Sequence, residues 1–84
     1  VGEDVAAAEW AERAARSPGA HVLIAMTASA TQAIICEDAK AAQWAANVRS
    51  RNPVLTREDF FRAFPMKSEV TRARVANALA GLGF

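Results

Sequence analysis

The apolar positions at the start of the chain recur at the spacing of an α-helix. The stretch "EDVAAAEWAERAAR", residues 3–16, gathers along one side Val5, Ala8, Trp10, Ala11, Ala14 and Ala15. Acidic side chains open this stretch and basic side chains close it, as the helix macrodipole favours. The tripeptide "SPG" follows directly and stops a helix. The pattern predicts a helix over residues 3–16.

The next segment fits two structures. Residues 21–36 contain two runs rich in β-branched side chains, "HVLIAM" and "TQAIIC", which a short β-hairpin could pair through "TASA". That connection lacks the Gly, Asn or Asp that a tight hairpin normally contains. A helix is favoured instead, because Ser29 and Gln32 have the spacing of a capping box ahead of further apolar residues. The spacing of apolar residues alone does not distinguish a helix from a strand in runs this short, so a hairpin at 21–36 remains the alternative.

Residues 38–50 form a clearer helical pattern. Asp38 is a good N-cap, and Asn52-Pro53 ends the helix because the residue before proline is pushed out of the α region. One side of this helix is lined by Ala39, Ala42, either Ala45 or Ala46, and Val48, and is the expected core-facing side.

Two further helices are predicted in the last third of the chain. Thr56 caps "REDFFRAF" with Asp59 in capping-box spacing. Ser68 caps a final helix that runs to about Leu82. Its expected core residues are Val70, Val75, Leu79 and Leu82. Together these patterns predict a compact, mainly all-α fold of four to five helices.

Composition agrees with one small helical domain over residues 1–84. The chain is 52% hydrophobic, but alanine supplies much of that share, and alanine favours closely packed helices. The single cysteine excludes an internal disulfide and indicates a reduced, cytoplasmic setting. No apolar run approaches the ~18–20 residues of a membrane span. Because the chain begins with Val1 and not methionine, we expect a fragment of a longer protein.

No enzyme, metal site or cofactor is expected. His21 and Cys36 are the only side chains of their kinds, and a structural histidine and a buried thiol are the favoured interpretations. Clustered metal ligands and a glycine-rich phosphate loop are both missing from the sequence. Trp10 and Trp44 can add bulk to a thin core or anchor a partner, and we expect the core role for at least one.

Charge is distributed unevenly between the two halves. Residues 1–46 carry six acidic and three basic side chains, whereas residues 47–84 carry three acidic and seven basic ones. Six of those seven are arginine, the better side chain for phosphates and guanine edges. The basic half is compatible with solvated helix faces or with a nucleic-acid partner.

The order of parts in residues 53–84 provides a further indication. An extended lead-in, a polar cap, a short helix, a tight turn and a longer basic helix end in a leucine-glycine-apolar stop. The segment "NPVLTREDFFRAFPMKSEVTRARVANALAGLGF" thus resembles part of a helix-turn-helix or winged-helix domain, at the level of the superfamily.

This resemblance implies DNA binding through the helix of residues 68–82. The second helix of such a motif packs one face on the core and presents the start of its other face to bases and phosphates. The free N–H groups at the helix start can also hold a phosphate. The candidate contact residues are Arg57, Lys67, Ser68, Arg72, Arg74 and Asn77.

A protein-interaction or oligomerisation module of a larger assembly is the alternative. The alanine-rich faces of residues 3–16 and 38–50 permit close approach of another helix, and the tryptophans can act as anchors. Pairing through either face would give a homodimer or a complex with a protein partner.

Overall fold

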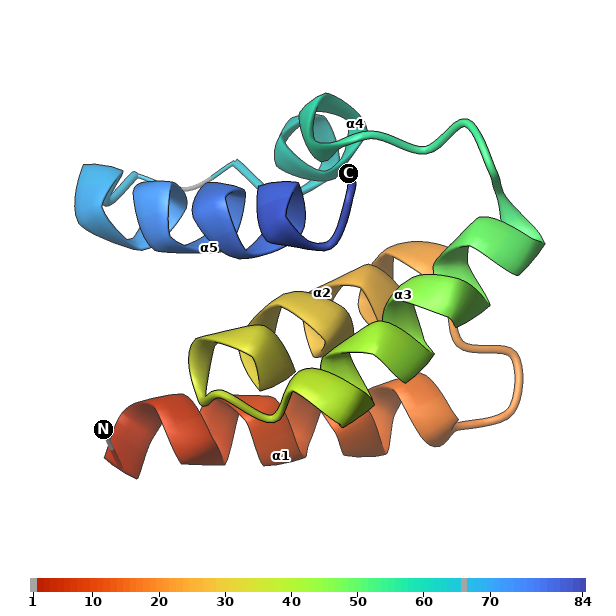
Figure 1. Cartoon of the computed structure of the whole chain (residues 1–84), viewed down its shortest axis with the longest axis horizontal. Helices are drawn as coiled ribbons and strands as arrows, with labels where there is room; N and C mark the ends of the chain where they lie inside the picture. Colours follow the sequence, from red (N-terminus) through yellow and green to blue (C-terminus); the bar gives the residue numbers. More distant parts are fainter. Residues whose placement is uncertain (1, 66) are drawn as a thin grey trace.

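Five helices follow one another in the computed structural model, which describes residues 2–65 and 67–84 (Figure 1). They are α1 (Gly2–Arg16), α2 (Val22–Ile34), α3 (Asp38–Arg51), α4 (Arg57–Ala63) and α5 (Glu69–Gly81). No strand occurs in these ranges, which confirms the all-α prediction. Residue 66, in the predicted turn before the last helix, lies outside the described part.

Helix α2 occupies the centre of the fold. It packs against α1, α3 and α5, while α4 packs against α5 (Figure 1). The Cα radius of gyration is 11.5 Å, close to the ~12 Å expected of a compact chain of this length. The central position of α2 explains why this segment is the most apolar part of the sequence.

The ambiguous segment is one helix, so the hairpin alternative is wrong. Helix α2 begins at Val22, and the Nδ1 atom of its N-cap His21 accepts a hydrogen bond of 3.1 Å from the Leu23 N–H. Ser29 and Gln32 lie buried in the middle of the helix and therefore form no capping box. Packing on three sides overrides the β-preference of the branched side chains.

Small residues bring the helices close together, and a few large ones fill the remaining space. The buried alanines of α1, α2 and α3 are Ala8, Ala11, Ala15, Ala25, Ala28, Ala30, Ala41 and Ala45. The larger buried side chains are Met26, Val48, Phe60, Val75 and Leu79. Trp44 packs against this core from α3, which confirms the core role expected for one tryptophan.

Some residues expected on the core side of their helices are exposed. Val70 is 73% exposed, although it was expected to face the core, and Trp10, placed on the apolar side of the first helix, is 63% exposed. Helix α3 buries Ala41, Ala45 and Val48, whereas Ala39, Ala42 and Ala46 are exposed. Alanine is apolar but common on both sides of a helix, so an alanine-rich pattern locates the buried face poorly.

The predicted caps of the last two helices are confirmed. At α4, the Asp59 N–H donates to the Thr56 hydroxyl over 3.4 Å, and the Thr56 N–H donates to the Asp59 carboxylate over 3.0 Å. At α5, the Ser68 hydroxyl accepts from the Thr71 N–H over 3.3 Å. Helix α3 differs, because Glu37 and not Asp38 is its N-cap, without a side-chain hydrogen bond.

Helices α2 and α5 end in the same way. The Glu37 N–H donates to the Gln32 carbonyl over 2.8 Å, and the Phe84 N–H donates to the Leu79 carbonyl over 2.9 Å. Each bond closes a Schellman motif around a residue with positive φ. That residue is Gly83 (φ 91°) after α5 but Cys36 (φ 64°) after α2. The Cys36 side chain is exposed, so the prediction of a buried thiol is wrong.

Candidate nucleic-acid interface

Phe60 fixes the position of α4 and thereby of the whole candidate interface. Its ring is buried in the core. The ring of Phe61 meets it edge-on, and the ring of Phe64 meets it at an angle, each with centroids 5.3 Å apart. Because Phe60 and Phe61 are neighbours on a helix, burying one turns the other toward α5. Phe61 therefore lies half-buried between the two helices.

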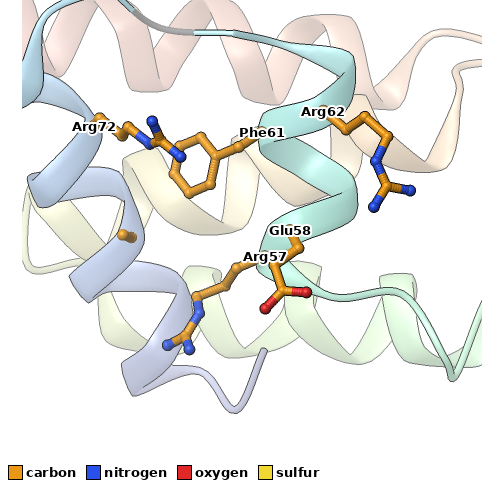
Figure 2. Close-up of a pocket in the computed structure, with 6 residues that line it drawn as sticks. Arg57, Glu58, Phe61, Arg62 and Arg72 are labelled. Atoms are coloured by element: carbon orange, nitrogen blue, oxygen red, sulfur yellow. The ribbon is translucent and has the colours of Figure 1, made fainter.

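An open groove of about 500 Å³ runs between α4 and α5 (Figure 2). Its lining consists of Arg57, Glu58, Phe61, Arg62, Arg72 and Ala76. In Figure 2, Arg72 reaches from α5 to the Phe61 ring, and the Arg72 Cζ atom lies 5.2 Å from the centroid. A cation–π contact of this kind holds a guanidinium in place while its N–H groups stay available.

The charges around the groove are only partly neutralised. Arg62 lies 3.5 Å from Asp59 in an ion pair along α4, and Glu58 adds a carboxylate at the rim. For Arg57 and Arg72 the structure records no ion pair with any described residue. Arginines suit the geometry of phosphate and carboxylate oxygens, so the groove can bind an anion.

Lys67 and Ser68 lie at the N-terminus of α5. The Lys67 side chain is exposed. The Ser68 hydroxyl is engaged as the helix cap. This end of α5 carries the positive pole of the helix dipole, which adds to the charge of Lys67.

Arg74 lies apart from the other predicted contact residues. It forms a two-pronged ion pair with Asp4 of α1, with N–O distances of 2.7 and 3.3 Å. The hydrogen bond from Arg74 holds the pKa of Asp4 below its ordinary value of 3.8, and Asp4 in turn raises the pKa of Arg74. Two positions along a helix differ by about 200°, so Arg72 and Arg74 flank α5 on opposite sides.

The outward face of α5 carries little positive charge. Its exposed residues are Glu69, Val70, Ala73, Asn77 and Ala80. Asn77 is the one predicted contact residue on this face, and Glu69 is the one charged side chain. The arginines of α5 therefore do not point straight outward, as the helix-turn-helix resemblance would lead one to expect.

Two other arginines of the basic half hold parts of the fold together. Arg49 donates to the Leu82 carbonyl and lies over the Phe84 ring, with its Cζ atom 4.7 Å from the centroid. Arg51 donates to the Ala20 carbonyl in the loop between α1 and α2. A count of charges in the sequence includes these two side chains in a basic surface. In the structure, each of them donates a hydrogen bond to a backbone carbonyl of a distant segment of the chain.

Four residues that line the groove were not predicted as site residues: Glu58, Phe61, Arg62 and Ala76. A signal for two of them was present, since Arg57 and Phe61, and Arg72 and Ala76, are each spaced at i, i+4. Each pair therefore lies along one side of its helix. The sides of α4 and α5 that face each other are determined by how the two helices pack. The sequence pattern of one helix alone does not determine that packing.

The described residues offer little for other chemistry. They contain no group of three or more His, Cys, Asp or Glu side chains placed to hold a metal ion. His21 caps α2, as the structural interpretation expected. None of the helices in the described part has the length and apolar character needed to cross a membrane.

Comparison with protein-family models, curated proteins and solved structures gives no match to this chain. What the chain does must therefore be inferred from its own residues.

Proposed function

We propose that this chain binds DNA through the groove between α4 and α5. The observation that carries the proposal is that Arg57 of α4 and Arg72 of α5 line the same groove, where Arg72 lies over the Phe61 ring. Lys67 adds a third cation at the nearby helix N-terminus. These three side chains contact backbone phosphates, and Asn77 is the amide best placed for a base edge.

The arrangement of α4 and α5 supports this proposal. A short capped helix followed in the chain by a longer capped helix whose Val75 and Leu79 are buried agrees with two parts of a helix-turn-helix. The contact surface differs from the simplest version of that motif. It lies along the boundary of the two helices, and Arg74 is not part of it, because Asp4 holds its guanidinium.

The number of cations at the proposed interface sets the expected salt dependence of DNA binding. Each phosphate neutralised by a cation contributes about −0.9 to the slope of log K against log salt. Three cations give a slope of roughly −3, typical of weak and strongly salt-dependent binding. The outward face of α5 offers one side-chain amide, that of Asn77, for hydrogen bonds to bases, so the chain should discriminate poorly between DNA sequences. Phosphate contacts therefore dominate the affinity.

The test is fluorescence anisotropy with a labelled DNA duplex at several salt concentrations. The double variant Arg57→Ala, Arg72→Ala should bind at least about tenfold more weakly and lose roughly two units of salt slope. The matched control is Arg16→Ala with Lys40→Ala, which removes the same charge from exposed positions of α1 and α3.

The control should keep the wild-type salt slope to within about half a unit. If the two double variants lose affinity equally, binding follows net charge and not the groove, and the proposal fails. It also fails if the wild-type chain does not bind the duplex at low salt.

A further inference from the structure

The exposed face of α1 is unusual for a surface helix. Glu3, Ala6, Ala7, Trp10 and Arg13 follow one another at intervals of about one turn, and all are exposed. Trp10 leaves 63% of its surface in solvent. A large exposed aromatic among alanines is common at interfaces, where tryptophan is among the strongest anchors.

Trp10 also borders an apolar cavity. A hollow of about 360 Å³ is lined by Trp10, Ile24, Thr27, Phe60 and Phe64, from α1, α2 and the α4 region. Phe64 is itself 42% exposed. This surface shares no lining residue with the groove between α4 and α5. A concave apolar surface beside an exposed tryptophan is suited to an apolar partner surface.

The charges on this face of α1 are complementary to those on the same face of a second copy in antiparallel orientation. Helix α1 has acidic residues in its first turn and basic residues in its last turn. In an antiparallel pair of α1 helices related by a two-fold axis near residue 8, Glu3 lies opposite Arg13 of the second copy. The same symmetry places each Trp10 over Ala6 of the other copy. Large side chains then meet small ones, and opposite charges meet at both ends.

We infer that the exposed face of α1 is a homodimer interface that pairs antiparallel with the α1 face of a second copy. A two-fold contact is self-complementary, so each feature that favours pairing acts twice. The pairing covers both tryptophans and the apolar hollows beside them. It leaves the groove between α4 and α5 free, and therefore does not depend on DNA binding.

The first test is analytical ultracentrifugation of the chain from about 1 µM to 1 mM. The wild-type chain should become dimeric within this range. Trp10→Ala should weaken dimerisation at least about thirtyfold, as removal of a central tryptophan anchor usually does. Val54→Ala is the matched control, since Val54 is an exposed apolar residue away from α1, at 79% exposure. Its dimerisation should equal that of the wild type.

A charge exchange tests the antiparallel geometry. Glu3→Arg alone and Arg13→Glu alone each place like charges opposite one another at both ends and should weaken dimerisation about tenfold. A mixture of the two variants should form heterodimers as readily as the wild type forms homodimers, because opposite charges then face each other again. Circular dichroism of each variant checks that its helices remain folded.

Three results would overturn the inference. One is a wild-type chain that stays monomeric over the whole range, which would leave the α1 face to a different partner. Another is a dimer that Trp10→Ala does not weaken. The third is a mixture of charge variants that associates no better than either variant alone.

Discussion

At the scale of single residues, the arginines of the C-terminal half differ in what each guanidinium contacts. Arg49 and Arg51 hold backbone carbonyls, and Arg74 pairs with Asp4. Arg57 and Arg72 face the open groove instead. The sequence identifies all of them as basic but does not show these contacts, because the partners lie far away. Asp4 is separated from Arg74 by 70 positions along the chain.

The ion pair between Asp4 and Arg74 should make stability depend on acid pH. Because folding lowers the Asp4 pKa, the pair stabilises the fold above the ordinary value of 3.8 and loses this effect as pH falls through the lowered pKa. The variant Asp4→Asn should therefore melt at a lower temperature than the wild type at neutral pH. The two melting temperatures should converge in strong acid, as measured by circular dichroism from about pH 7 to pH 2. A constant difference over that range would contradict this role.

Replacing Cys36 with glycine should stabilise the fold. Its φ of 64° lies in the left-handed region, where a side chain is strained and glycine is not. We expect Cys36→Gly to raise the free energy of unfolding by about 0.5–1 kcal/mol, measured by urea denaturation. The control Cys36→Ser keeps a side chain at the same φ and should stay within about 0.5 kcal/mol of the wild type. A loss of stability in the glycine variant would show that the turn is not strained.

At the scale of helices, the caps of α4 and α5 were predictable from the sequence, whereas the caps predicted at Ser29 and Asp38 were wrong. Thr56, Asp59 and Ser68 have local signatures, and the structure confirms all three. Helix α2 was less predictable, because its branched residues suit a strand until three neighbouring helices surround them. The Schellman motif at the end of α2 could not be predicted either. Gly83 marks the end of α5, whereas cysteine gives no local sign of the positive φ that ends α2.

The capping box should supply much of the local stability of α4. This helix has only seven residues, Arg57–Ala63, too few to be stable without capping and packing. Thr56→Ala removes the hydroxyl that accepts the Asp59 N–H and should lower the free energy of unfolding by about 1 kcal/mol in urea denaturation. Ser50→Ala, on the exposed side of α3, should change it by less than about 0.5 kcal/mol. Equal effects of the two variants would mean that the box contributes nothing.

At the scale of the whole molecule, the packing of α5 on α2 and of α4 on α5 decides what the basic half can do. A charge count predicts a broad positive surface. Four of its seven cations, Arg49, Arg51, Arg62 and Arg74, form hydrogen bonds or ion pairs with other groups of the chain. The remaining three, Arg57, Lys67 and Arg72, belong to the α4–α5 region. They were all predicted, but the groove that unites two of them depends on tertiary packing.

The most direct test of the proposed interface is an NMR titration of the side-chain Nε–H groups of the arginines with a DNA duplex. The signals of Arg57 and Arg72 should shift in proportion to bound DNA, because phosphates approach both guanidinium groups. The signal of Arg74 should stay in place, because Asp4 already holds it. Shifts centred on Arg74 and the outward face of α5, with Arg57 and Arg72 unchanged, would contradict the account.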